Sequence, residues 1–212
     1  MKNAHPLTSQ NVISNVVLIK LEKLKPIEKI FTTHLQYIQN QIENTKVINK
    51  PLIIDNTHHI ILDGSHRYAY LKKHGYKFAP VIMVDYNSSL INVGSNLIHR
   101  FINSNNSKIT KEDVLNYALT NRLFSPRTTR HFFPFTKKNH PIKLDTLIRG
   151  NQCNIDYLIS EVSTEDEIKN NQNYLQEIEN ELELIGTYIQ EQQSVKQYLK
   201  KQIENMQDSL TT

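Results

Sequence analysis

Short β-branched runs and helical stripes alternate along the first part of the chain. Four runs rich in valine, isoleucine and leucine predict β-strands, at residues 16–19, 51–55, 59–63 and 79–84. Between the first two runs, apolar residues recur at helical spacing at Leu35, Ile38 and Ile42. This spacing predicts a helix over residues 33–44. The polar turn at 56–58 is typical of a hairpin between the second and third runs.

A second helix is expected directly after the third run. Gly64 interrupts that run, and Ser65 can cap a helix whose apolar face includes Tyr68 and Leu71. Gly75 then ends the helix, because glycine readily adopts the left-handed conformation found at helix C-termini. This order of strands and helices predicts an α/β fold, of the α+β kind with a mixed sheet.

The region after the last strand is less regular. Residues 86–110 are rich in asparagine and serine and predict a loop that carries one short element at 97–101. Thr110 begins a sequence that resembles a capping box, and an amphipathic helix is expected from there to about Leu123. A following Ser-Pro pair ends this helix and leads into the basic turn 127–131.

The last fifty residues have a heptad periodicity. The seam residues are Ile168, Leu175, Ile178, Leu182, Ile185 and Ile189, and a similar stripe resumes after residue 192. This pattern predicts one long helix over residues 164–210, which Gly186 can weaken. A seam of this length usually finds a partner, so we expect a homodimer through the C-terminal helix. A hairpin broken at Gly186 that packs back on its own body is the alternative.

Length and composition place the chain among ordinary globular proteins. With 212 residues and 38% hydrophobic content, it can form one globular core with an added element. No window approaches the ~18 consecutive apolar residues of a membrane span, and the first ten residues lack the order of a signal peptide. We therefore expect a cytoplasmic protein with no membrane partner. The single Cys153 excludes an internal disulfide and any multi-cysteine metal site.

The charge is distributed unevenly along the chain. Residues 1–160 carry 21 lysines and arginines against 10 acidic residues, whereas residues 161–212 carry 4 against 11. A basic body suits a polyanionic ligand, which can be a nucleotide or a nucleic-acid backbone. An acidic tail is more typical of a solvated helix or of a surface that binds a partner.

The segment 60–67 carries the clearest chemistry in the chain. It places Asp63 at a strand end, a glycine next, and a serine, His66 and Arg67 in the first turn of a helix. Free backbone N–H groups and the helix dipole favour an anion there, and the glycine lets a phosphate approach the backbone. Asp63 suits a divalent cation or a base. The combination points to phosphoryl chemistry; a capped helix with solvated histidine and arginine is the plainer alternative.

Two blocks of the chain resemble a known group of proteins. The first block includes Leu24-Lys25-Pro26-Ile27-Glu28, Lys50-Pro51-Leu52-Ile53-Ile54-Asp55 and Ile61-Leu62-Asp63-Gly64-Ser65-His66-Arg67-Tyr68. It resembles the ParB N-terminal and sulfiredoxin-like superfamily, and its Asp-Gly-x-His-Arg sequence resembles that of free serine kinases. The second block, residues 109–131, is similar to the same family's second conserved block. Together the resemblance covers residues 12–148 and leaves the tail unexplained.

The resemblance implies an architecture and an activity. A ParB/sulfiredoxin-like kinase domain would span residues 12–150, followed by an acidic, coiled-coil-like helical tail over residues 161–212. The enzyme would phosphorylate free L-serine to O-phospho-L-serine, with ATP or ADP as the donor and Mg²⁺ as the metal. L-serine and nucleotide are then the expected partners, and nucleic acid is not.

The same resemblance implies a role for each site residue. Glu28 matches the family's catalytic glutamate, which takes the proton from the serine hydroxyl as it attacks. Asp63 would bind Mg²⁺ or act as a second carboxylate. The phosphate would be held by Gly64, Ser65, His66 and Arg67, with Thr128, Thr129, Arg130 and His131 as a second wall against phosphate or the serine carboxylate.

Related families can be weighed on their reactive residues. Sulfiredoxins place a catalytic cysteine before the His-Arg pair, where this chain has Ser65, a weak nucleophile. ParB proteins carry a Gly-Glu-Arg-Arg motif and a helix-turn-helix module, and neither is recognisable here. A nucleotide-responsive, ParB-like DNA-binding regulator stays the alternative function. Residues 91–96 lack the aromatic residue that the family usually has near the amino-acid pocket, so another small hydroxylated metabolite stays open as the acceptor.

Overall fold

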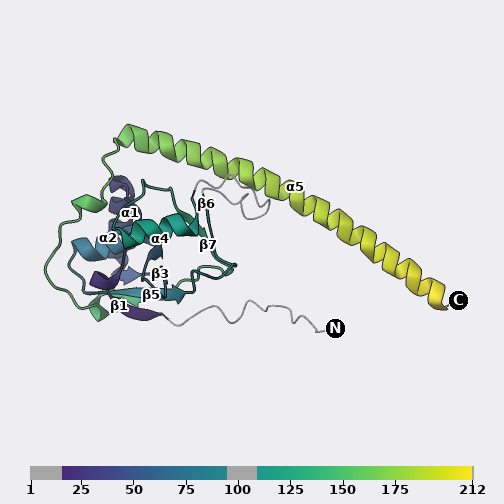
Figure 1. Ribbon diagram of the computed structural model, residues 1–212, viewed down its shortest axis with the longest axis horizontal. Helices are drawn as coiled ribbons and strands as arrows, with labels where there is room; N and C mark the ends of the chain where they lie inside the picture. The colour runs from purple at the N-terminus through teal and green to yellow at the C-terminus, as the bar shows by residue number, and fades with distance from the viewer. Residues whose placement is uncertain (1–15, 95–108, 212) are drawn as a thin grey trace.

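A four-stranded mixed sheet lies at the centre of the computed structural model, which describes residues 16–94 and 109–211 (Figure 1). The strands, in their order across the sheet, are β1 (Val17–Lys20), β5 (Phe78–Val84), β3 (Leu52–Asp55) and β4 (Ile61–Asp63). β3 runs parallel to β5, whereas the β1–β5 and β3–β4 pairs are antiparallel. The expected strands, the hairpin and the mixed sheet are therefore confirmed.

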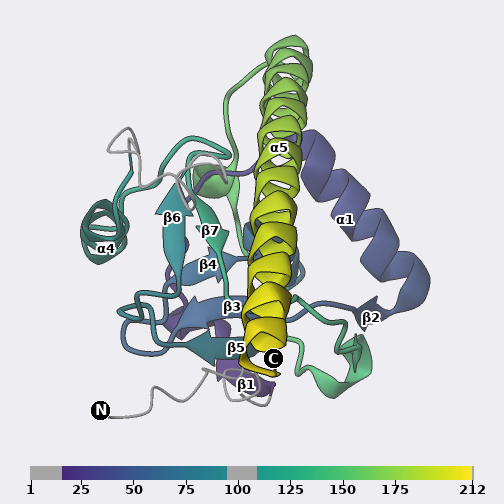
Figure 2. The ribbon, with the colours of Figure 1, turned by 90° about the vertical axis from the view of Figure 1, so that its right-hand side faces the viewer.

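The helices lie on both faces of the sheet (Figure 2). Those in the described ranges are α1 (Thr32–Thr45), α2 (Ser65–Lys73), α4 (Lys111–Leu119) and α5 (Thr164–Thr211). Leu52 and Ile54 of β3 pack in one core with α1 and α2. Ile53, between them, packs in the second core with Val114 of α4. Side chains of a strand alternate between the two faces of a sheet, which explains this division.

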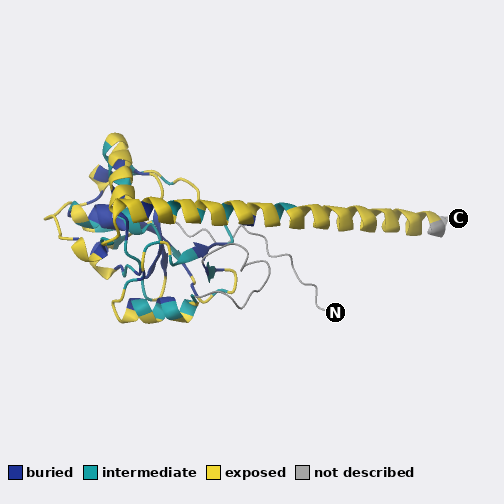
Figure 3. Cartoon of the chain, turned by 90° about the horizontal axis from the view of Figure 1, so that it is seen from above, coloured by how far each residue is buried: buried dark blue, intermediate teal, exposed yellow. Residues whose placement is uncertain are grey.

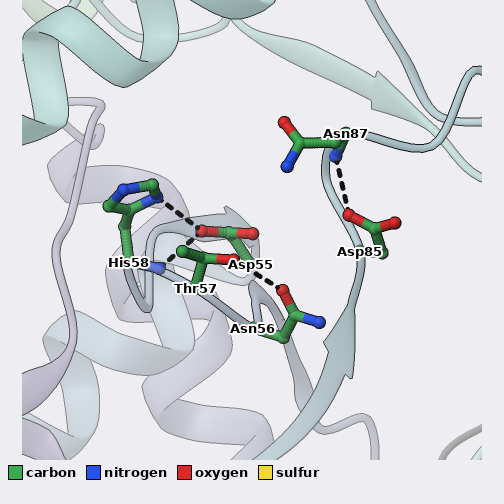
Figure 4. A network of polar contacts seen from close by, with 6 residues as sticks. All are labelled: Asp55, Asn56, Thr57, His58, Asp85 and Asn87. Carbon is green, nitrogen blue, oxygen red and sulfur yellow. Dashed lines mark hydrogen bonds and ion pairs between the residues drawn. The ribbon is translucent and has the colours of Figure 1, made fainter.

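The β3–β4 hairpin is closed by a buried carboxylate. Asp55 accepts hydrogen bonds from the backbone N–H of His58 at 2.6 Å and, across 3.1 Å, pairs with the His58 ring (Figure 4). A side chain that accepts from the backbone in this way stabilises a turn. The next connection is held similarly, because the N–H of Asn87 donates to Asp85 at 3.0 Å. Asp55 therefore acts in folding and lies outside the site described below.

Two small sheets complete the body. β2 (Val47–Ile48) pairs with β8 (Ile142–Lys143), and β6 (Asn92–Gly94) pairs with β7 (Arg130–Phe132). β6 lies where a loop was expected and β7 begins inside the expected basic turn, so strand structure there was missed. The short element expected at 97–101 lies outside the described residues. The short 3₁₀ helices in the described residues are η2 (Leu21–Lys23), η3 (Leu144–Thr146) and η4 (Asp156–Leu158).

Helix ends follow their local chemistry. Thr110 and Asp113 form the expected capping box at the start of α4. α4 ends at Leu119, earlier than expected, and Asn121 follows with a positive φ of 53°. The expectation that Ser65 caps α2 is wrong, because Gly64 occupies the N-cap position and Ser65 is the first helical residue. Its C-terminus is as expected, with Gly75 at a φ of 76°.

The C-terminal helix is continuous over 48 residues. It passes through Gly186 without interruption, so the hairpin alternative is wrong. Its first half lies along the body and its second half extends well beyond it (Figures 1 and 3). Ile155 and Leu158, just before the helix, still belong to the hydrophobic core. Neither α5 nor any other helix in the described ranges is long and apolar enough to cross a membrane.

Candidate functional site

Glu28 lies on an extended segment that crosses the edge of the body. Ile27 and Ile30 are buried on either side of it and anchor the segment in the two cores. The segment also pairs with Phe124, whose N–H donates to the carbonyl of Ile27 at 2.8 Å, while Lys29 donates to the carbonyl of Phe124 at 2.9 Å. These contacts direct the half-buried Glu28 side chain toward the turn that precedes β7.

That turn supplies hydrogen bonds to the Glu28 carboxylate. The backbone N–H of Thr129 donates to Oε1 at 2.8 Å, and the Thr129 hydroxyl lies 3.3 Å from the same oxygen. Burial nevertheless raises the pKa of Glu28 to about 7, since it outweighs these stabilising bonds. A carboxylate with such a pKa accepts a proton efficiently near neutral pH.

The N-terminus of α2 faces the same region. Gly64 precedes the helix with a φ of 103°, a conformation that side-chain-bearing residues rarely adopt. No side chain caps this end of α2 in the structure. The first N–H groups of a helix have no intrahelical partner, so those of Ser65, His66 and Arg67 are available to an anion.

Asp63 sits between two cations at the end of β4. Its carboxylate lies 3.0 Å from Nη2 of Arg67 and 3.3 Å from Nζ of Lys137. Burial would raise the pKa of Asp63, but the two cations more than offset this, and the pKa is lowered from its ordinary value. Asp63 is therefore ionised at neutral pH, unlike Glu28, which titrates there.

Arg67 is largely occupied by the protein itself. Its Nη1 donates to the backbone carbonyls of Lys50 at 2.6 Å and Pro51 at 3.0 Å, and its Nη2 donates to Asp63. The guanidinium thus ties α2 to the segment that leads into β3. These bonds use three of the five N–H groups of the guanidinium.

His66 is held as a neutral imidazole. Burial lowers its pKa to about 3, and the neighbouring His34 adds to the effect. The two rings meet edge to face, with centroids 4.4 Å apart. Nε2 of His66 is buried and has no hydrogen-bond partner in the described structure. A buried polar atom without a partner is costly, which suits a group that completes its hydrogen bonds with a ligand.

These residues line one cavity of about 500 Å³. Glu28, Asp63, Gly64, Ser65, His66, Arg67 and Thr129 from the expected site all border it. The rest of the lining includes Ile38, Gln41 and Ile42 of α1, Val47 and Ile48 of β2, and Asn49, Lys50 and Asn139. The volume lies within the range of small-molecule sites, and the lining combines an anion site with further polar and apolar side chains.

The second expected block contributes less to this cavity than the sequence suggested. Thr129 borders it, but Thr128, Arg130 and His131 do not. His131 is fully buried, where its Nε2 lies 2.9 Å from the Tyr86 hydroxyl, and burial lowers its pKa to about 3. Arg130 faces α5, where its Nη1 lies 3.9 Å from Glu181. The alternation of side chains along β7 separates these neighbours.

Two residues at or near the cavity, His34 in its lining and Lys137 beside Asp63, were missed by sequence reasoning. Lys137 pairs with Asp63 although 74 positions separate them, and His34 meets His66 from the first turns of α1. Neither lies in a motif, and both are polar residues in stretches that read as solvated. Only the packing of α1 brings His34 to the cavity, and only the packing of the segment after β7 brings Lys137 to Asp63.

The donor set limits how a metal could bind. In the described parts of the chain, no group of three or more His, Cys, Asp or Glu side chains is arranged to hold a metal ion. Asp63 is an ionised carboxylate that borders the anion site. Mg²⁺ in phosphoryl-transfer sites is commonly bound by one or two carboxylates together with the substrate phosphates. The residues present therefore fit an Mg²⁺ ion that arrives with a nucleotide.

Comparison with curated proteins finds L-serine kinases. An ATP-dependent L-serine kinase from Staphylothermus marinus is 35% identical over 74 residues, which are 33% of this chain and 29% of the relative. An ADP-dependent L-serine kinase from Thermococcus kodakarensis is 32% identical over 81 residues, 36% of this chain and 34% of the relative. The chain thus spans about a third or less of these relatives. No protein-family model matches it.

Solved structures show where the fold is shared. A conserved hypothetical protein from Pyrococcus furiosus aligns with a TM-score of 0.55 at 19% identity, over 64% of this chain and 98% of that one. A free serine kinase in complex with AMP aligns with a TM-score of 0.54 at 18% identity, over 66% and 98%. A glutamate-to-alanine variant of a free serine kinase in complex with ADP gives the same TM-score. The body of this chain has the fold of these proteins.

Proposed function

We propose that this protein is a kinase that transfers a phosphoryl group from ATP or ADP to the hydroxyl of free L-serine. The observation that carries the proposal is one cavity in which Glu28, a carboxyl with a pKa of about 7, faces the anion-binding N-terminus of α2. The curated relatives named as L-serine kinases and the fold shared with free serine kinases support this assignment.

Glu28 would act as the general base. As the serine oxygen forms its bond to the terminal phosphorus, the hydroxyl proton passes to the Glu28 carboxylate and the bond to the leaving nucleotide phosphate breaks. The N–H groups at the start of α2 and the free N–H groups of Arg67 would hold the phosphate oxygens, where charge develops. The neutral His66 would donate or accept one further hydrogen bond. The apolar side chains in the lining, Ile38, Ile42, Val47 and Ile48, would contact the nucleotide base.

Mg²⁺ would be held by Asp63 together with the nucleotide phosphates, and when bound it neutralises phosphate charge during transfer. Arg67 and Lys137 keep Asp63 ionised and oriented for this role. ATP and ADP share the base and the first two phosphates, and the proposal covers either donor. The donor is a cytoplasmic metabolite, and we place the reaction in the cytoplasm.

The rest of the architecture follows from the same assignment. We assign the body, residues 12–150, to the ParB/sulfiredoxin-like superfamily and treat residues 161–212 as an added helix. A ParB-like regulator that only binds nucleotide and DNA gains nothing from a half-buried carboxylate beside a phosphate site, because two anions repel. We therefore expect that the protein does not bind nucleic acid. We also propose that two copies pair through the projecting half of α5.

The proposal is tested by phosphorus NMR of the full chain with Mg²⁺, L-serine and either ATP or ADP. We expect a phosphomonoester signal that coincides with added O-phospho-L-serine. L-threonine and L-homoserine in place of L-serine test the acceptor, since each differs by one methyl or methylene group. Absence of phosphoserine with both nucleotides would overturn the proposal, and a stronger signal from another acceptor would change the substrate.

A further inference from the structure

α5 reaches back to the turn that holds Glu28. Within its first half, Glu167, Asn171, Tyr174, Ile178, Glu181 and Ile185 are buried or half-buried, and they recur every three or four positions. They therefore form one face that the body covers. The rest of α5 is largely exposed (Figure 3). This face is a specific docking surface, because it includes two acidic residues at only 4–5% exposure, Glu181 and Glu167.

Two arginines that flank Thr129, Arg127 and Arg130, contact this face. The Tyr174 ring lies beneath both guanidinium groups, 5.1 Å from Cζ of Arg127 and 5.7 Å from Cζ of Arg130. Arg130 also faces Glu181 at 3.9 Å. Arg127 is exposed and Arg130 is half-buried, so each cation–π contact is modest, and together the two contacts hold Tyr174 against the turn. α5 thus contacts the turn on both sides of the residue that donates to Glu28.

The turn needs such support. Arg127 has a φ of 62°, a left-handed conformation that costs energy for a residue with a side chain. Its guanidinium lies between the Tyr174 ring and the Phe31 ring, whose centroid is 5.6 Å away. A second contact fixes α5 itself, because Thr33 at the start of α1 donates to Glu167. The helix therefore joins the start of α1 to the turn before β7.

We propose that Tyr174 and Glu181 of α5 are positioning residues, which hold the 127–130 turn so that Thr129 can orient the Glu28 carboxylate. The inference deepens the proposed function, because orientation of Glu28 matters only if it acts as the base. The tail then belongs to the working enzyme, although it lies outside both sequence blocks that resemble the kinases. A small displacement of a catalytic group lowers the rate of the catalysed reaction and has little effect on ligand binding.

The test compares two substitutions of one residue with a control on the same helix. Tyr174→Leu removes the ring, and we expect kcat for phosphoserine to fall about 10-fold or more while the nucleotide Kd stays within about twofold. Tyr174→Phe keeps the ring and should retain most of the wild-type kcat. Tyr198→Leu removes an exposed tyrosine of α5 outside the covered face and should change neither. Glu181→Gln, which keeps shape but removes the charge opposite Arg130, should lower kcat in the same direction as Tyr174→Leu.

Amide exchange provides a readout that does not depend on turnover. The Thr129 N–H is bonded to Glu28, so Tyr174→Leu should speed its exchange about 10-fold or more, whereas the Ile61 N–H, bonded to the Lys25 carbonyl, should keep its rate. Unchanged Thr129 exchange and unchanged kcat in Tyr174→Leu would overturn the inference. If the wild type makes no phosphoserine, the proposed function fails, and the exchange rates still decide whether α5 holds the turn.

Discussion

Glu28 is a carboxyl whose burial and hydrogen bonding oppose each other. Two groups of Thr129 stabilise its ionised form, yet burial prevails and leaves the pKa at about 7. The sequence identified this residue only through its resemblance to a family, because a glutamate after a proline reads otherwise as a solvated loop residue. Its burial depends on Phe124 and Thr129, about a hundred positions away.

The raised pKa of Glu28 predicts a pH dependence of stability. A carboxyl with a folded pKa above its unfolded value of 4.5 stabilises the fold below that value, and this contribution is lost as pH rises through about 7. Glu28→Gln cannot ionise, so it should gain on the order of 2–3 kcal/mol of unfolding free energy relative to wild type between pH 5 and pH 8. Urea unfolding of both proteins at the two pH values measures this. Parallel pH profiles would show that Glu28 has an ordinary pKa.

Asp63 differs from Glu28 because two cations lie beside it and keep it ionised. Removing the charge of Asp63 should therefore affect metal binding. Asp63→Asn keeps the shape but offers Mg²⁺ a weaker ligand, so Mg²⁺ should enhance nucleotide binding less than in wild type. Calorimetric titration of ADP with and without Mg²⁺ provides the measurement. Asp85→Asn, in an exposed turn outside the cavity, is the matched control. An equal Mg²⁺ effect in wild type and Asp63→Asn would remove Asp63 from the metal site.

At the scale of elements, strands and helices were predictable where one local pattern decided the structure. The four sheet strands, the capping box at Thr110 and the stop at Gly75 all follow from short-range signals. β6 and β7 were missed because each has three residues and exists only through pairing with the other. Arg130 and His131 were expected in the cavity because sequence neighbours were taken together, whereas strand geometry turns them to other surroundings.

Gly64 and Gly75, at the two ends of α2, should respond differently to substitution by alanine. A Cβ at Gly64 would lie 2.9 Å from Nη2 of Arg67 and 3.1 Å from Leu52, and one at Gly75 would lie 2.4 Å from the Asn151 carbonyl oxygen. Both positions have positive φ, so alanine at either should destabilise the fold by about 1–3 kcal/mol. Only Gly64→Ala should weaken nucleotide binding, because it disturbs the cavity. Titration of the folded proteins checks this, and equal nucleotide affinity in both variants would contradict the phosphate site.

At the scale of the whole molecule, α5 has two halves with different surroundings. The expected seam included Ile178 and Ile185, but both are half-buried on the face that the body covers. Leu199, Ile203 and Met206, in the C-terminal part of α5, are exposed. The heptad pattern correctly predicted a long helix, yet it could not show which half the body would occupy. The body thus covers Ile178 and Ile185, while Ile168, Leu175, Leu182 and Ile189 of the seam stay exposed. The pairing that we propose is through the projecting half.

This division predicts where a charge would separate the proposed dimer. Ile203→Glu places a charge in the apolar stripe of the projecting half and should give a monomer, because buried like charges repel. Gln197→Glu adds the same charge outside the stripe and should leave the dimer intact. Sedimentation equilibrium of the three proteins measures their masses. A monomeric wild type at every concentration tested would refute the pairing.

Glu28 is the residue on which the proposed phosphoryl transfer depends most directly. The decisive measurement is the rate of O-phospho-L-serine formation by wild type and by Glu28→Gln, at saturating serine and nucleotide, alongside the nucleotide Kd of each. We expect Glu28→Gln to lower kcat by about 10²-fold or more, the usual share of a general base, with an almost unchanged Kd. Equal rates in the two proteins would contradict the assignment of Glu28 as the base.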